Sequence, residues 1–116
     1  MTITDGRWTG SIWDTHLHLD RTGRFIDAAL DFARTGGSHM CLVHKPGFGE
    51  DLPTSIEEVR SSYQNTLEIA EMVRRKCNID VRVILGPHPV VWEHQSRKLG
   101  FEKAGELHID SVEIAL

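Results

Sequence analysis

Long apolar runs are missing from this chain. No stretch of its 116 residues approaches the roughly 20 apolar residues that a helix needs to span a bilayer. Residues 1–11 also lack the basic-then-apolar layout of a secretory signal. We therefore expect no membrane association, and we expect the protein to be cytoplasmic.

Cysteine is scarce, and basic charge is not in excess. The two cysteines, Cys41 and Cys77, fit no metal-binding or redox spacing, so we expect reduced thiols, with Cys41 buried in a strand. The formal net charge of −4 gives no basic footprint of a dedicated nucleic-acid-binding module. The negative net charge does not exclude a nuclease, because bound metal cations would reverse the sign of the local charge.

The sequence also lacks the common nucleophile and phosphate-binding motifs. It contains no Gly-rich phosphate loop, no serine elbow and no cysteine nucleophile motif. It does contain seven histidines. A water molecule activated by a divalent metal is then the simplest chemistry, because a bound cation lowers the pKa of water to about 7.

Apolar periodicity predicts three strands. Segment 11–19 alternates between two sets of residues, which indicates a strand. Short apolar runs at 39–44 and 81–85 are typical of buried strands. Proline and glycine end the second run and predict a loop over 46–53.

Two helices are predicted between these strands. Apolar residues recur at helical spacing over 25–34, and the glycine pair 36–37 supplies left-handed residues that end this helix. The second helix starts at a capping box formed by Ser55 and Glu58. Each helix therefore connects one predicted strand to the next.

The order of the elements indicates part of a barrel. Residues 90–116 are predicted to be helical with a break near Gly100, so the order is β-α-β-α-β-α, which implies a parallel sheet with crossover helices. Eight such units form a TIM-like (β/α)8 barrel of about 250 residues. The chain holds three units and ends inside a predicted helix. We therefore expect residues 1–116 to be the truncated N-terminal part of a single barrel domain.

Four histidines fall at the carboxyl ends of predicted strands. His16 and His18 close the first strand, His44 closes the second, and His88 follows the third. Functional groups of parallel α/β folds gather at these ends, because the loops there surround one crevice. The other three histidines are expected to have surface or structural roles: His39, His94 and His108.

The pair His16 and His18 is the strongest sign of a metal site. Residues two apart on a strand face the same side, so both imidazoles can reach one ion. Asp14 is predicted to lie on this side too and to accept a hydrogen bond from a ligand's second ring nitrogen. The opposite side is predicted to carry the apolar set: Trp13, Thr15, Leu17 and Leu19. The alternative is a pair of structural histidines without a metal.

His88 and His44 are candidate substrate-binding residues. His88 lies between Pro87 and Pro89, whose rigid rings favour a fixed orientation of the imidazole. Either histidine can instead order a loop. These two alternatives stay open at this point.

Three segments together resemble a known family. Residues 14–20, Asp-Thr-His-Leu-His-Leu-Asp, resemble the first-strand motif of the amidohydrolase superfamily, and of TatD-related metal-dependent hydrolases in particular. Residues 36–43 and 85–90 resemble the second and third strands of the archaeal branch of that group. The resemblance extends in order over nearly the whole chain.

The resemblance implies a TIM-like barrel that holds one or two divalent ions of the Zn, Mn or Mg class. It implies hydrolysis of ester or phosphodiester bonds in a small-molecule or nucleic-acid substrate, including a possible deoxyribonuclease. His16 and His18 match metal ligands, and His88 matches a histidine near the substrate. His44 departs from the family pattern, and the family's other ligands belong to later strands.

Two alternatives remain. The same scaffold supports other amidohydrolase-type reactions, namely hydrolysis of a lactone, amide or phosphotriester. The chain can also be a non-catalytic metal-binding fragment, since three βα units do not close a barrel.

Overall fold

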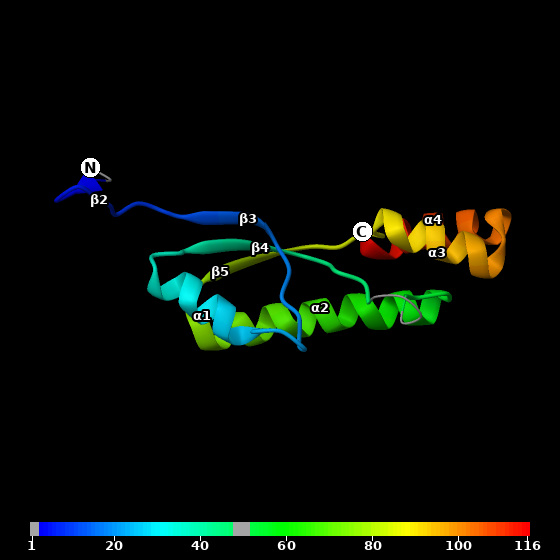
Figure 1. Cartoon of the computed structure of the whole chain (residues 1–116), viewed down its shortest axis with the longest axis horizontal. Coiled ribbons are helices and arrows are strands. Elements are labelled where there is room, and N and C mark those ends of the chain that lie inside the picture. The colour runs from blue at the N-terminus through cyan, green and yellow to red at the C-terminus, as the bar shows by residue number, and fades with distance from the viewer. Residues whose placement is uncertain (1–2, 48–51) are drawn as a thin grey trace. The chain divides into compact units, whose positions relative to one another are not determined.

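The computed structural model describes residues 3–47 and 52–116 and contains both helices and strands (Figure 1). The predicted loop over 46–53 therefore lies partly outside the described residues. The chain divides into two compact units. Their described residues come from Met1–Val43 with Glu68–Val83 for unit 1, and from His44–Leu67 with Ile84–Leu116 for unit 2.

A three-stranded parallel sheet forms the centre of unit 1. Its strands are β3 (Trp13–Leu17), β4 (His39–Val43) and β5 (Asp80–Ile84), arranged in the order β3-β4-β5. The three predicted strands are thus confirmed; the first two are shorter than predicted, and the third is shifted by one residue. The mixed α/β class and the parallel sheet are confirmed with them.

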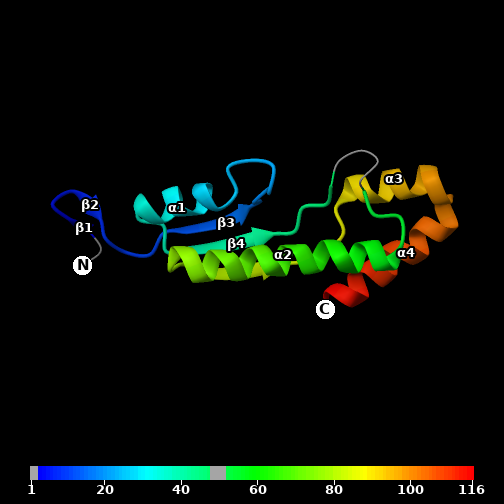
Figure 2. The same ribbon diagram turned by 90° about the horizontal axis from the view of Figure 1, so that it is seen from below.

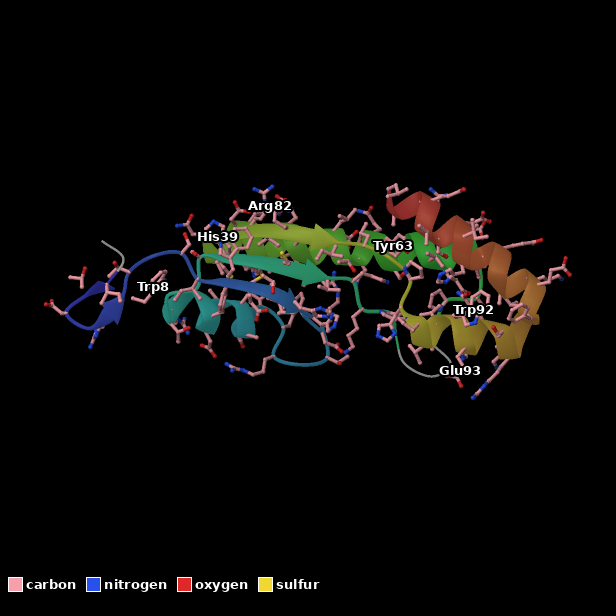
Figure 3. The ribbon with its side chains drawn as sticks, turned by 90° about the horizontal axis from the view of Figure 1, so that it is seen from above. Trp8, His39, Tyr63, Arg82, Trp92 and Glu93 are labelled. Atoms are coloured by element: carbon pink, nitrogen blue, oxygen red, sulfur yellow. The ribbon has the colours of Figure 1, made fainter. Side chains whose placement is uncertain are left out.

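One face of this sheet carries the core of unit 1. Helix α1 (Ile26–Arg34) and the C-terminal part of α2 (Ile56–Cys77) pack against the same strand face. Met40 and Leu42 of β4 are each only 1% exposed there. In Figures 1 and 2, α1 and this part of α2 lie on one side of the sheet, and Figure 3 views the sheet from the other side. Both crossover helices thus lie on one face of the sheet.

The alternation predicted for the first strand is wrong because β3 contains an irregularity. Asp14 pairs with Met40 and Leu17 pairs with Leu42, so three steps along β3 match two along β4. Paired residues of neighbouring strands share a face, and a bulge of this kind resets the alternation. Asp14 therefore lies on the same face as Leu17 and not on the opposite one.

Trp13 lies on the other face, against its partner on β4. The rings of Trp13 and His39 are stacked with centroids 4.2 Å apart, and Ser38 hydrogen-bonds the His39 ring at 2.7 Å. His39 therefore begins its strand and has a structural role, as predicted.

The end of α1 is formed by the glycine pair, but only one glycine is left-handed. Gly36 has φ of +105°, its amide donates to the carbonyl of Ala33 at 3.1 Å, and the Gly37 amide donates to that of Phe32 at 2.8 Å. These two bonds make a Schellman motif. The prediction that Gly37 is also left-handed is wrong; the Phe32 ring instead covers its Cα.

Unit 2 is helical. Its elements are the N-terminal part of α2, α3 (Pro89–Leu99) and α4 (Phe101–Ala115). Gly100, with φ of 86°, separates α3 from α4, which confirms the predicted break. The core of this unit contains Val59, Tyr63 and Leu107.

Side-chain hydrogen bonds fix the ends and contacts of these helices. The Ser55 hydroxyl accepts from the Glu58 amide at 3.2 Å, but the Glu58 carboxylate accepts from the Thr54 amide at 2.8 Å. Half of the predicted capping box is thus confirmed, and the other half is shifted by one residue. The buried Gln95 amide donates to the carbonyl of Pro53 at 2.9 Å.

The sequence prediction missed a short hairpin near the N-terminus. Strands β1 (Ile3–Thr4) and β2 (Arg7–Trp8) pair antiparallel. Asp5 and Gly6 join them with φ of 51° and 74°. Asp-Gly is a preferred pair for a two-residue hairpin turn that requires positive φ at both positions.

Both cysteines are free. Cys41 lies in β4, as predicted, but is half-buried rather than buried; Cys77 is buried. Burial raises the pKa of the Cys77 thiol, against a smaller lowering by Lys76. None of the described helices is long and apolar enough to cross a membrane.

The titration of Tyr63 tests whether this residue is buried in the core of unit 2. The Tyr63 hydroxyl donates to the carbonyl of Ser111 at 2.9 Å, and Figure 3 labels Tyr63 on α2. Burial raises the pKa of Tyr63 above its ordinary value of 10.0. Above about pH 10 the unfolded chain therefore loses this proton before the folded chain does, and the free energy of unfolding falls as pH rises.

Because Tyr63 is the sole tyrosine of the chain, its absorbance on ionisation reports its titration directly. We expect the native midpoint to lie above that of the urea-unfolded chain. Tyr63→Phe is expected to lower the free energy of unfolding by about 1 kcal/mol at neutral pH, through loss of the hydrogen bond. Equal midpoints in both states would contradict the burial of this residue.

Replacement of Gly37 and of Gly105 by alanine is expected to change the free energy of unfolding in opposite directions. A Cβ on Gly37 would meet the Phe32 ring at under 3.0 Å, whereas a Cβ on Gly105 would meet Trp92 at 3.5 Å, an ordinary contact. Gly37→Ala is expected to lower the free energy of unfolding by about 1–3 kcal/mol through overpacking. Gly105→Ala is expected to raise it by about 0.5–1 kcal/mol through helix propensity. Urea unfolding of both variants measures this; shifts of the same sign would argue against the packing described.

Candidate functional site

The structure brings His16 and His18 together at the end of β3. His16 belongs to the strand, and His18 follows it directly. Both residues are exposed. Their ring centroids are 5.2 Å apart, and the rings are perpendicular, with an interplanar angle of 88°. The two imidazoles are therefore neighbours that are open to solvent.

This separation fits two ligands of one ion. With metal–nitrogen bonds of about 2.0–2.1 Å and a tetrahedral angle between them, the ring centres of two imidazole ligands lie about 5 Å apart. The 5.2 Å between His16 and His18 agrees with this distance. Neutral imidazole is a preferred ligand of Zn²⁺ and of other divalent transition metals.

A backbone carbonyl fixes the His18 ring. Its Nδ1 lies 2.9 Å from the carbonyl oxygen of Val43 at the end of β4. A carbonyl can only accept, so Nδ1 carries the proton and Nε2 has the free electron pair. Metal-ligating histidines commonly donate their second ring nitrogen in this way, which sets both tautomer and ring orientation. Nε2 is therefore the ring nitrogen through which His18 could hold a metal ion.

Asp14 lies beside the pair, with a different hydrogen bond from the one predicted. Its Oδ1 accepts from the backbone amide of His16 at 3.1 Å, not from an imidazole nitrogen. Asp14 and His18 line the same cavity of about 180 Å³, between β3 and α1. Asp14 thus holds the irregular turn of the backbone from which the histidines project.

The described residues supply two donors rather than a full ligand set. Within 3–47 and 52–116, no group of three or more His, Cys, Asp or Glu side chains is arranged to hold a metal ion. Nearby, Asp20 is engaged with Thr22, whose amide and hydroxyl donate to its Oδ1 at 2.9 and 2.7 Å. A catalytic zinc site usually has three protein ligands, so His16 and His18 would form part of one.

His44 is enclosed by unit 2, which favours the structural alternative over contact with a substrate. It is only 5% exposed. Its Nδ1 lies 2.8 Å from the Thr66 hydroxyl, and its Nε2 lies 3.5 Å from the Ser62 hydroxyl. The ring of Tyr63 packs edge-on at 4.8 Å. Both ring nitrogens thus have hydrogen-bond partners within the protein, as is typical of a structural histidine.

His88 is the N-cap of α3. Its Nδ1 accepts from the Val90 amide at 3.1 Å, and Pro89 begins the helix. The ring is thus held in one orientation, as the flanking prolines predicted. Since Nδ1 accepts, the proton lies on Nε2, and this nitrogen of an exposed side chain can donate to a ligand. Contact with a substrate stays a prediction.

Two substitutions separate the capping role of His88 from a substrate role. His88→Ala is expected to lower the free energy of unfolding by about 1 kcal/mol, because the cap is lost. His88→Asn is expected to keep stability within a few tenths of a kcal/mol, because asparagine is a strong N-cap. If His88 donates to substrate, both variants raise KM for a phosphodiester. An unchanged KM in His88→Asn would show that His88 only caps the helix.

The remaining histidines lie on helices, as predicted. His94 is in α3 and His108 is in α4. His108 packs edge-on against Trp92, with ring centroids 5.4 Å apart, and both line a cavity of about 410 Å³ with Pro87 and Pro89. The sequence prediction missed this cavity, because it depends on how α3 and α4 pack.

Comparison with protein-family models, with curated proteins and with solved structures finds no match to this chain.

Proposed function

We propose that this chain is the N-terminal part of a metal-dependent hydrolase of the TatD type, which acts on ester or phosphodiester bonds. The observation that carries the proposal is the exposed pair His16 and His18, with ring centres 5.2 Å apart and the Nδ1 of His18 bonded to the Val43 carbonyl. This geometry suits a divalent ion, and the sequence around it resembles that family.

The fold supports the proposal. Strand order β3-β4-β5 with α1 and part of α2 on one face suits a barrel wall, whereas doubly wound folds place helices on both faces. The histidine pair lies at the carboxyl end of β3, where barrel enzymes have their active sites. A complete barrel would supply the further strands and ligands.

His16, His18 and Asp14 have distinct proposed roles. His18 binds the ion through Nε2, and the Val43 carbonyl keeps its ring in place. Asp14 fixes the backbone at His16, which places the second imidazole beside the first. A divalent ion held by these residues would supply an activated water for attack on the ester. The proposal includes a deoxyribonuclease as one form of this activity.

A substrate panel tests the reaction type. The panel contains bis(p-nitrophenyl) phosphate, a lactone, an amide and a phosphotriester, each assayed with Zn²⁺ or Mn²⁺. The samples are the chain itself and the longer protein, if the reading frame continues past Leu116. We expect metal-dependent hydrolysis of the phosphodiester, lost in His16→Ala and His18→Ala and kept in His94→Ala. Preference for another substrate would replace the TatD type with a different amidohydrolase activity.

A non-catalytic metal-binding chain is the second candidate. The two-donor set within the described residues 3–47 and 52–116 favours it, because two protein ligands suffice to bind an ion but rarely to complete a catalytic site. Metal binding that depends on His16 and His18 without hydrolysis of any panel substrate by the longer protein would support this candidate.

A further inference from the structure

Helix α4 has an exposed apolar strip along one side. Phe101 is 76% exposed, Ile109 60% and Val112 41%. These three residues form what we call the α4 strip; at 3.6 residues per turn they fall within an arc of about 80°. The buried face of α4 is a different one, made by Ala104, Leu107 and Ser111. Exposed apolar surface of this kind marks an interaction site.

A cavity opens beside the α4 strip. It measures about 410 Å³ and is lined by Pro87, Pro89, Trp92 and His108. The Trp92 ring also packs edge-on against Phe101, with centroids 5.5 Å apart, and it extends from α3 towards α4 (Figure 3). The cavity therefore adjoins the strip, and its volume is sufficient for a large apolar side chain.

A row of carboxylates borders the other edge of the α4 strip. Glu102, Glu106, Asp110 and Glu113 are exposed and recur at intervals of four, four and three residues. None of them makes an ion pair or side-chain hydrogen bond with another residue in the part of the chain that the structure describes. The basic residue of α4, Lys103, lies beyond the row.

We infer that the cavity, the α4 strip and the carboxylate row form a docking site for a cationic amphipathic helix of a partner protein. One large apolar side chain of the partner fills the cavity, its apolar face packs on the strip, and its lysines or arginines face the row. Between Phe101 and Val112 the strip runs for about 17 Å along α4, which matches a partner helix of about three turns.

Charge decides between this partner and the other possible occupants. An anionic lipid surface or a nucleic acid would bring like charge against four carboxylates. A second copy of the chain, paired through α4, would bring the row near its own equivalent. A cationic helix has the complementary charge. This inference does not depend on the metal proposal, since all its residues belong to unit 2.

The test uses the whole chain and a designed 18-residue peptide with leucine on one helical face and lysine on the other. Calorimetry at low salt is expected to show binding to this peptide and at least about tenfold weaker binding to a scrambled peptide of the same composition. Phe101→Ala and the double variant Glu102→Gln with Glu113→Gln are each expected to weaken binding about tenfold. Phe101 is largely exposed, so these variants should fold.

The control for Phe101→Ala is Trp8→Ala, which removes another exposed aromatic side chain. The control for the carboxylate variant is the double variant Asp27→Asn with Glu57→Gln, which also neutralises two carboxylates. Both controls are expected to bind the peptide as the wild type does. Binding is also expected to persist when His16 and His18 are both alanine. Equal affinity for the scrambled peptide, or unchanged affinity in the strip and row variants, would overturn the inference. A dimer of the chain that Phe101→Glu dissociates would also overturn it, in favour of a second copy as the occupant.

Discussion

Replacing His16 or His18 by alanine is expected to weaken the binding of Zn²⁺ by at least about 100-fold. Loss of a residue that only orients a ligand costs about 10–100-fold in affinity, and loss of the ligand itself removes a metal–nitrogen bond. Both side chains are exposed, so the free energy of unfolding should change by less than about 0.5 kcal/mol. Calorimetric titration and urea unfolding of the same samples measure the two quantities.

His94→Ala is the matched control. It also removes one of the seven histidines of the chain, but this histidine lies in α3 and not at the end of β3. We expect it to bind Zn²⁺ as the wild type does. In the double variant, His16 and His18 are both alanine. We expect its affinity for Zn²⁺ to be only slightly lower than that of the weaker single variant, because one remaining imidazole already holds an ion poorly. Wild-type affinity in both single variants would refute the metal site.

Replacing His44 by alanine is expected to lower the free energy of unfolding by about 2–4 kcal/mol. The substitution leaves a cavity against Tyr63 and removes one of the two hydrogen-bond partners of the buried Thr66 hydroxyl, the other being the Ser62 carbonyl. Because His44 is not one of the proposed ligands, the affinity for Zn²⁺ should not change while the protein is folded. Urea unfolding and calorimetry at a temperature well below the transition measure both effects.

A conservative variant distinguishes packing from chemistry at this position. His44→Gln keeps an amide that can bond to Thr66 or Ser62, and we expect it to recover part of the lost stability. A variant of His44 that unfolds like the wild type and binds substrate more weakly would restore the substrate-binding role that the sequence predicted.

Much of the fold follows from sequence periodicity. Strands β3, β4 and β5, helices α1 and α2, and the break at Gly100 all lie close to their predicted positions, because local patterns of apolar residues and glycines determine them. The hairpin β1–β2 also had a local signal in Asp5-Gly6, which the prediction overlooked. These features depend on neighbours in sequence.

The features that the sequence could not predict depend on neighbours in space. The irregularity of β3 arises from its register with β4 and moves Asp14 to the face of Leu17. The oxygen that fixes His18 belongs to the backbone of Val43, so no residue type marks it. The two candidate substrate histidines look alike in sequence, each at a strand end, but His44 is buried and His88 caps a helix.

The central claim is that His16 and His18 share one divalent ion, with Nε2 of His18 as a ligand. A long-range ¹H–¹⁵N spectrum of the imidazoles, recorded during a Zn²⁺ titration, observes all seven histidines at once. We predict that the signals of His16 and His18 change first and together, and that His18 keeps its proton on Nδ1 while Nε2 shifts to a metal-bound value. Changes confined to other histidines, or a proton on Nε2 of His18 at saturation, would contradict this account.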